Sequence, residues 1–464
     1  MTRVIIIGLD GFGPAFTRRV FDAGLMPFLA SRAGDGVWGP AASTVPPVST
    51  AAWTTITTGV GIGRHGIVDF RRRTPADYGF TEPGRFVNGD DVRAPRLYDL
   101  AGEAGARCFV LNVPVTYPAR EINGVMVAGM LTPPGSDRGC WPADFRQHLA
   151  DYSYDLDEPV PADLPALCRR LEDLATGRAR VAEAAFGRER FDLGMVVFTG
   201  PDRLFHRHYA EVCAPEDPAA IPPPAASYLR TLDGACERIC AAFGEDAAFI
   251  ICSDHGFGPG PRQAFFVNRA LKKAGLLAVR PAFSPYALNI MLFGLKKLLG
   301  KAKPLPVDWR RSAAYGFPLY MGWGGVFLNV RGEQPEGIVD TADVAGVAER
   351  VARALEDSAA TRWVKTRAEL YDGPAITELP HVVFEAEAGT VVSEGKGPGP
   401  LVAPYEDARK LGEHTSQAIM AVAGGGVSAQ MPASPGIADV AATAAALLGL
   451  DVRPFDGVPW APIS

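Results

Sequence analysis

The chain has 464 residues, enough for one large domain or roughly two or three smaller ones with a substantial buried core. Its hydrophobic content of 47% and charged content of 21% are those of an ordinary globular protein. A formal net charge of −6 argues against a broadly basic surface, and therefore against a stable nucleic acid partner.

The sequence contains few features that indicate where in the cell the protein is located. No apolar run approaches the length of about 18 residues that a spanning helix needs, so we expect no transmembrane segment. The first strand-like run begins at Arg3, and no signal-peptide pattern precedes it. The seven cysteines contain no CxxC pair and do not indicate a disulfide framework. We therefore expect a cytoplasmic protein, and the oligomeric state is left open.

Continuous apolar runs of strand length alternate with helical stretches along the chain. Because the runs are apolar throughout, they suit strands that are covered on both faces. The alternation predicts an α/β fold with a mostly parallel sheet flanked by helices, and a site at the carboxyl ends of its strands. The predicted strands are 3–9, 108–113, 193–198, 247–251 and 418–423, and the main helices are 164–186 and 225–243.

Residues 262–378 have a different pattern and predict an inserted α+β cap subdomain. The catalytic core would then comprise residues 1–261 and 379–464. The insertion contains a strand-like run at 325–330 and a helical one at 341–355. It also contains a basic amphipathic segment, residues 286–303, which we interpret as a packing helix in preference to a lid or a membrane-surface element.

Asp10 lies in a glycine-rich turn directly after the first predicted strand, in the segment Gly8-Leu-Asp-Gly-Phe-Gly13. The spacing is GxxGxG, whereas the dinucleotide-binding turn is GxGxxG, and a carboxylate inside the turn repels a pyrophosphate. An Asp at this place suits a bound cation instead. A turn-capping Asp is the alternative interpretation.

Ser49 marks the predicted start of a helix. Prolines exclude a helix until about Val48, and Gly59 is a suitable helix stop. In the simplest interpretation Ser49, or the adjacent Thr50, is only an N-cap. In the functional interpretation the hydroxyl is a nucleophile whose pKa a metal ion lowers, and the free N–H groups of the helix receive phosphoryl oxygens.

Two residues after this helix are candidates for contacts around the reacting group. His65 follows Gly59 in a loop and is a candidate for supporting the site by a hydrogen bond. Arg71, in the run Arg71–Arg73, is a candidate for gripping an anionic leaving group. A solvated charge cluster is an equally good interpretation of that run.

Carboxylates and imidazoles also follow other predicted strands. Asp202 and His206 come after the run 193–198, and their i, i+4 spacing puts both on one face of a helix, where they can meet one ion. Asp254 and His255 end the run 247–251, and both reach one ion if the chain turns there.

His414 immediately precedes the last predicted strand. A lone histidine is more often structural than functional. Here, however, three of only seven histidines fall at predicted strand ends in company with Asp residues, which favours metal ligands.

These segments together resemble the type I phosphodiesterase/nucleotide pyrophosphatase branch of the alkaline phosphatase superfamily. The resemblance spans nearly the whole chain and implies an alkaline-phosphatase-like core. The matching stretches are IIIGLDG, PPVSTAAWTTITTG followed by HGIVDF, PDRLFHRH, SDHGFG and GEHTSQAIMAVAG.

The resemblance implies two divalent metal ions, most simply Zn²⁺, although Mn²⁺ accepts the same kinds of ligand. One ion would be held by Asp202, His206 and His414. The other would be held by Asp10, Asp254 and His255.

Ser49 matches the nucleophile of the family, which is usually Thr, and would touch the second ion; the adjacent Thr50 is the fallback. Phe70 stands where nucleotide pyrophosphatases carry an Asn that helps to hold the phosphoryl group. This departure puts nucleotide specificity in doubt.

We therefore expect a hydrolase of phosphodiester or phosphoanhydride bonds in small, nucleotide-like molecules, acting through a covalent phosphoryl-serine intermediate. A phosphomonoesterase or a cofactor-independent phosphoglycerate-mutase-like phosphotransferase is the alternative within the superfamily. A sulfatase is disfavoured, because Ala51 and Trp53 stand where it needs Pro and Arg. A non-catalytic protein that binds a ligand or a membrane surface is the alternative of another class, although no ligand position is lost.

Overall fold

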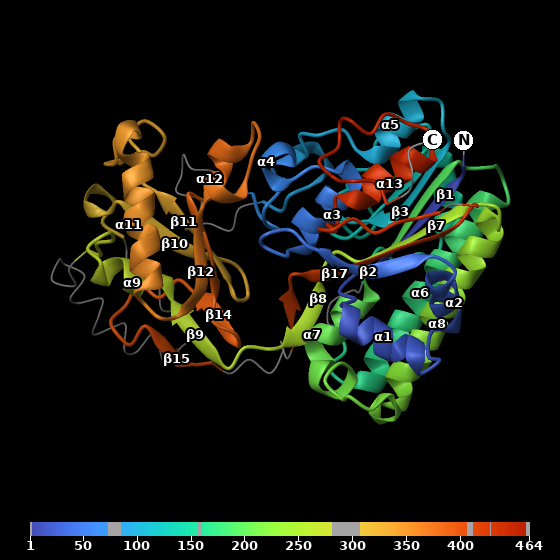
Figure 1. The fold of residues 1–464 in the computed structure, drawn as a ribbon, viewed down its shortest axis with the longest axis horizontal. Helices are drawn as coiled ribbons and strands as arrows, with labels where there is room; N and C mark the ends of the chain where they lie inside the picture. The colour runs from blue at the N-terminus through green and yellow to red at the C-terminus, as the bar shows by residue number, and fades with distance from the viewer. Residues whose placement is uncertain are drawn as a thin grey trace.

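The computed structural model describes residues 2–72, 85–155, 160–280, 307–405, 412–426 and 428–460. Within these residues the chain forms two lobes (Figure 1). The larger lobe is built on an eight-stranded sheet. In spatial order its strands are β2 (Val37–Ala42), β17 (Gln417–Gly424), β7 (Ala248–Cys252), β1 (Val4–Leu9), β6 (Leu193–Phe198), β3 (Cys108–Val113), β4 (Gly124–Ala128) and β5 (Cys140–Trp141).

The sheet is mostly parallel, as predicted. The adjacent strands β7, β1, β6, β3 and β4 run in one direction, whereas β17 is antiparallel to both of its neighbours and β5 is antiparallel to β4. The five predicted core strands are β1, β3, β6, β7 and β17, and all of them lie in this sheet. The expected α/β fold class is confirmed.

Helices cover both faces of the sheet, which explains why its strands are apolar throughout. Successive residues of β1 point to opposite faces: Ile5 and Ile7 join one buried cluster, whereas Val4 and Ile6 join the other. The helices α1 (Pro14–Asp22), α2 (Pro27–Gly34), α6 (Leu164–Phe186) and α8 (Pro223–Phe243) cover the first face, and α3 (Ser49–Thr58), α5 (Leu97–Glu103) and α13 (Asp439–Leu447) cover the second (Figure 1).

The smaller lobe contains two sheets and three described helices. One sheet has the order β10 (Ala314–Tyr320), β11 (Trp323–Leu328), β13 (Val382–Ala386), β12 (Thr361–Thr366), and the other has the order β14 (Thr390–Ser393), β9 (Gln263–Phe266), β15 (Val402–Pro404). The helices are α9 (Val267–Lys273), α11 (Val344–Glu356) and α12 (Arg367–Leu370). The predicted segment 286–303 lies outside the described residues.

The extent of this lobe differs from the predicted boundaries. Strand β13 pairs with β11 and β12, and β14 and β15 both pair with β9, although all three lie beyond residue 378. The predicted boundary placed residues 379–405 in the core, because a sequence pattern does not show which strands pair with one another. We therefore propose 262–405 as the extent of the inserted cap, with the core comprising 1–261 and the residues after 405.

A short two-stranded ribbon lies between the lobes (Figure 1). Its strands β8 (Gly256–Pro259) and β16 (Gly412–Thr415) are antiparallel, with His414 opposite Phe257. Strand β8 follows β7 on the way out of the core, and β16 leads back into β17. The ribbon thereby brings His414 beside the end of β7, more than one hundred residues away in sequence.

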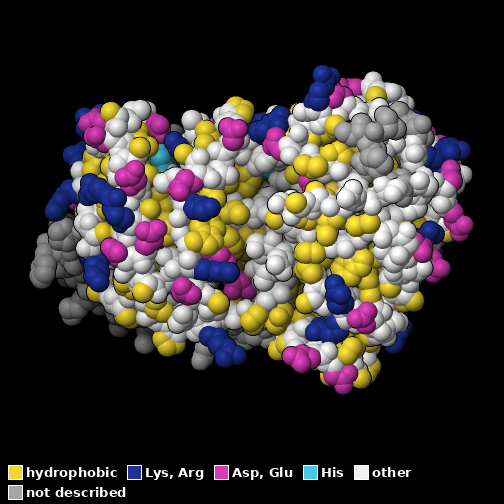
Figure 2. Space-filling view, in the orientation of Figure 1, with side chains coloured by type: hydrophobic (Ala, Val, Ile, Leu, Met, Phe, Trp, Pro, Cys, Tyr) yellow, Lys and Arg dark blue, Asp and Glu magenta, His cyan; other side chains and the backbone are white. Residues whose placement is uncertain are grey.

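The surface carries charges of both signs. On the face shown in Figure 2, Lys and Arg side chains are interspersed with Asp and Glu among the described residues. None of the helices in the described ranges is long and apolar enough to cross a bilayer.

The conformation of Gly59, in the turn that ends α3, allows a prediction about stability. Gly59 has φ +65°, and a Cβ there would lie 2.4 Å from the Phe455 ring. Gly59→Ala therefore combines left-handed strain with overpacking and should lower the free energy of unfolding by about 2–4 kcal/mol. Gly24 is the matched control, because it has φ +64° and nothing within 4 Å of the added Cβ. Gly24→Ala should cost only about 1 kcal/mol. Equal shifts in thermal denaturation would contradict the packing argument.

Candidate metal centre

The carboxyl ends of three neighbouring parallel strands bring the predicted acidic residues together. Asp10 follows β1, Asp202 lies in the helix α7 (Gly200–Val212) that follows β6, and Asp254 follows β7. Because β7, β1 and β6 are adjacent in the sheet, these side chains meet although they are far apart in sequence.

The predicted ligands form two groups. In each group the donor atoms all lie within 4.8 Å of one another. Five of the six side chains are buried, and His206 is only slightly exposed. The first group is Asp202, His206 and His414, and the second is Asp10, Asp254 and His255.

All three histidines are held in the same tautomer by the backbone. The Nδ1–H of His206 donates to the carbonyl of Gly412 (3.1 Å), and that of His255 donates to Gly256 (3.1 Å). His414 donates in the same way to Pro47 (2.9 Å). Each Nε2 lone pair therefore faces the cluster, which is how a metal-binding imidazole is oriented.

Two of the carboxylates have one oxygen held and one left for a cation. The indole N–H of Trp53 donates to Asp10 Oδ2 (3.1 Å), and the Gly11 N–H donates to Asp254 Oδ1 (3.1 Å). Among the described residues, Asp10 Oδ1 and Asp254 Oδ2 are buried and accept no hydrogen bond. An unpartnered buried carboxylate oxygen is costly, so this arrangement fits a bound cation.

Burial disfavours the charge that the carboxylates need to bind a metal, and it keeps the imidazoles of His255 and His414 neutral. It raises the pKa of Asp10 well above its usual range, with the Asp254 and Asp202 carboxylates adding to the effect. Burial raises the pKa of Asp254 to about 7 and lowers that of His414 to about 3. A divalent cation reverses the effect on the carboxylates and binds neutral imidazoles. The donor set of carboxylates and imidazoles therefore fits Zn²⁺, and Mn²⁺ as well.

Ser49 is the first residue of α3, as predicted, and its hydroxyl points to the second group. Its Oγ lies 3.2 Å from His255 Nε2, and the side chain is buried. Thr50 is buried too, and within the described residues its hydroxyl has no hydrogen-bond partner. Of these two hydroxyls, that of Ser49 lies within hydrogen-bonding distance of a predicted ligand, His255.

His65 is buried against the helix that carries Ser49. Its Nδ1 accepts from the Ile67 N–H (3.1 Å), so its Nε2–H donates to Thr55 Oγ1 (2.9 Å). Burial lowers the pKa of His65 to about 3, which keeps the ring neutral. These contacts support α3 from within the core.

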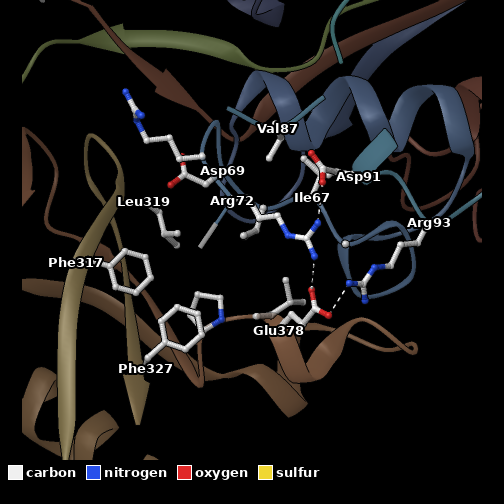
Figure 3. Close-up of a pocket in the computed structure, with 15 residues that line it drawn as sticks. Ile67, Asp69, Arg72, Val87, Asp91, Arg93, Phe317, Leu319, Phe327 and Glu378 are labelled. Carbon is white, nitrogen blue, oxygen red and sulfur yellow. Dashed lines mark hydrogen bonds and ion pairs between the residues drawn. The ribbon is translucent and has the colours of Figure 1, made fainter. Parts of the chain in front are cut away.

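Arg71 lines a cavity between the lobes (Figure 3). Its guanidinium lies over the Phe86 ring, 4.4 Å from the centroid. Nearby, Arg72 points between Asp91 and Glu378, at 2.8 and 3.9 Å, and thus links the core to the cap. Arg73 lies outside the described residues.

Three residues near the cluster were not identified from the sequence. Trp53 lies one turn after Ser49 in α3, so helical spacing was the available signal. Tyr320 comes from the cap, and no local pattern indicates its position. Arg203 follows Asp202 and lies 3.5 Å from its Oδ2, while its Nη2 pairs with Asp155 at 2.5 Å.

The comparisons with known proteins agree with this arrangement. The model of a family described as type I phosphodiesterase / nucleotide pyrophosphatase matches residues 4–417. The fold is similar to phosphonoacetate hydrolase from Sinorhizobium meliloti 1021 in complex with phosphonoformate, with a TM-score of 0.59 and 17% identity over 96% of each chain. It is also similar to an inactive murine ectonucleotide pyrophosphatase / phosphodiesterase 5 in complex with AMP, with a TM-score of 0.56 and 14% identity over 99% of this chain and 98% of that chain. A search of curated protein sequences gave no match.

The hydrogen bond from Trp53 to Asp10 makes a testable prediction about metal affinity. Trp53→Phe keeps most of the ring but removes the N–H donor that orients the carboxylate. Loss of such a contact should weaken binding of one ion by about tenfold to a hundredfold, measured by Zn²⁺ titration of the metal-free protein.

Trp460→Phe is the matched control for this change. Trp460 is also buried, and its indole N–H donates to Asp439 Oδ2 (3.0 Å) away from the cluster. Its loss should cost about 1 kcal/mol of stability and leave Zn²⁺ affinity unchanged. Equal Zn²⁺ affinities in the two variants would mean that Trp53 has no role in orienting a ligand.

Proposed function

Because the chain belongs to the type I phosphodiesterase / nucleotide pyrophosphatase family, we propose that it hydrolyses phosphodiester or phosphoanhydride bonds at Ser49. The main support is the common orientation of His206, His255 and His414, whose Nδ1–H groups donate to backbone carbonyls. Their Nε2 lone pairs converge with three buried carboxylates, an arrangement suited to two divalent ions.

Asp202, His206 and His414 would hold one ion, and Asp10, Asp254 and His255 the other. Zn²⁺ suits this mixture of imidazole and carboxylate donors, and Mn²⁺ accepts it too. When bound, the two ions supply positive charge for the phosphoryl oxygens and lower the pKa of the nucleophilic hydroxyl.

Ser49 would be the nucleophile. A bond from its Oγ to phosphorus forms as the bond from phosphorus to the leaving oxygen breaks. Water then attacks the phosphoryl-serine, which releases the product and restores the hydroxyl. The first N–H groups of α3 have no carbonyl partners within the helix, so they are available to the phosphoryl oxygens at this end.

Contacts with neighbouring residues hold the Ser49 hydroxyl in position. The hydroxyl lies 3.2 Å from His255 Nε2, and both side chains are buried. His414 donates to the carbonyl of Pro47, two residues before Ser49, and so ties the segment that precedes α3 to the first metal group. The nucleophile is therefore oriented before a substrate arrives.

Ser49→Ala should lower kcat by about a thousandfold or more, because it removes the atom that attacks phosphorus. The fold and the metal content should persist, since six other donors remain. A phosphoryl-enzyme trapped from labelled substrate should map to residue 49. Thr50→Ala is the control and should retain turnover, and a label found on Thr50 would reverse the assignment.

Bond preference is the second prediction for this site. A monoester dianion carries an extra charge, and Arg203 is a cation that contacts a carboxylate of the candidate metal site, Asp202. Its guanidinium already pairs with Asp155 and lies beside Asp202. We therefore expect kcat/KM for an aryl phosphodiester to exceed that for the matching monoester by at least about tenfold, or ~1.4 kcal/mol.

The measurement is a hydrolysis assay of matched aryl diesters and monoesters, with metal content determined on the same sample. Chelation should abolish both activities, and Zn²⁺ or Mn²⁺ should restore them. Equal or faster monoester hydrolysis would favour the phosphomonoesterase alternative. Activity that persists in chelator-treated, metal-free protein would falsify the two-ion mechanism itself.

A further inference from the structure

The β10–β11 hairpin of the cap reaches the first candidate metal group. Strands β10 and β11 are joined by a tight turn at Met321 and Gly322, and Met321 has φ 45°. The Gly322 N–H donates to Glu413 Oε1 (2.6 Å), and the Val392 N–H donates to the Met321 carbonyl (2.7 Å). The turn is therefore fixed both to the cap and to β16, the strand that carries His414.

Tyr320, the last residue of β10, lies at the first metal group. Its Oη is 2.7 Å from His206 Nε2 and 3.2 Å from His414 Nε2. Its ring centroid is 4.3 Å from that of His414 and 6.3 Å from that of Phe70. The phenol ring therefore lies between His414, a predicted metal ligand, and Phe70 in the loop after α4 (Ile62–His65).

The distances among the donors have the pattern of a coordination shell. His206 Nε2 and His414 Nε2 are 3.0 Å apart, and they lie 3.3 and 3.1 Å from Asp202 Oδ1. For Zn–ligand bonds of about 2.0–2.1 Å, the edges of a regular tetrahedron of donors are about 3.3–3.4 Å long. With the two Tyr320 distances, five of the six edges among these four donors are known, and they lie between 2.7 and 3.3 Å, at or below the tetrahedral edge length.

Catalytic zinc sites have three protein ligands and keep a fourth position for water or substrate. Asp202, His206 and His414 are the three ligands of this group, and Tyr320 Oη stands at the fourth corner. Its oxygen has lone pairs to offer an ion, as the carboxylate and imidazole groups do.

We propose that Tyr320 is the fourth ligand of the ion held by Asp202, His206 and His414, supplied by the cap. This inference rests on the proposed two-ion function. In the present arrangement of the β10–β11 hairpin, Tyr320 Oη occupies the fourth coordination position, which a substrate oxygen would otherwise take. A phosphoryl oxygen would take the place of Tyr320 Oη at the ion, so substrate binding would be coupled to movement of the β10–β11 hairpin.

Zn²⁺ titration of the metal-free full-length protein tests the ligand assignment. Tyr320→Phe removes only the hydroxyl, so the variant should still take up two ions but bind one of them about tenfold more weakly. Tyr371→Phe is the matched control, because Tyr371 is a buried cap tyrosine whose hydroxyl donates to the Val45 carbonyl of the core (2.7 Å). Its Zn²⁺ affinities should equal those of the wild type.

Inorganic phosphate binding to the Zn²⁺-loaded proteins tests the displacement. Phosphate should bind Tyr320→Phe at least about threefold more tightly than the wild type, because no ligand has to be displaced. The measurement is isothermal titration calorimetry, with Tyr371→Phe again expected to match the wild type.

The outcomes separate this inference from the proposed function. Unchanged Zn²⁺ affinity in Tyr320→Phe overturns the ligand assignment and leaves the two-ion hydrolase standing. Weaker phosphate binding by that variant overturns displacement, since Tyr320 would then be assisting the oxyanion. A wild-type protein that binds no Zn²⁺ at these residues overturns the metal centre and this inference together.

Discussion

Buried charge at the ends of β1, β6 and β7 is the constraint on which the rest of this structure depends. Three carboxylates and three imidazoles meet there in two groups, and most of these side chains are inaccessible to water. Isolated buried carboxylates are costly, and burial, together with repulsion from neighbouring carboxylates, drives Asp10 and Asp254 toward their neutral forms. A pair of cations would make such a cluster stable, and the same cations would give it the electrostatic character that the proposed phosphoryl transfer requires.

The hydrogen bonds around the cluster follow from that constraint. Backbone carbonyls from three separate segments fix the imidazoles in one tautomer, and the indole of Trp53 fixes Asp10. In each hydrogen bond the side chain uses the atom that faces away from the candidate metal groups, which is Nδ1 of a histidine or Oδ2 of Asp10. The Nε2 or Oδ1 atom that faces the groups is left available to an ion. This division leaves one buried oxygen of Asp10 and one of Asp254, both in the second candidate metal group, without a hydrogen-bond partner among the described residues.

The cap takes part in the site as well as covering it. Tyr320 reaches two histidines of the first group, and Glu413, next to His414, holds the hairpin turn at Gly322. Away from the cluster, Glu378 of the cap pairs with Arg93 of the core at 2.5 Å. The lobes are therefore in contact both at the candidate metal groups and at the Glu378–Arg93 ion pair. We expect the position of the cap and the binding of a metal to influence each other.

The sequence by itself predicted the strands of the core and the start of α3 at Ser49 from local signals, and its family resemblance supplied the grouping of the six candidate metal ligands. A buried parallel strand is apolar throughout, and ligands follow directly at its end. Tertiary structure alone decided that β13–β15 pair with strands of the smaller lobe, and that Tyr320 lies beside His206 and His414. Strand pairing and contacts between lobes join residues far apart in the chain, so no spacing or periodicity encodes them.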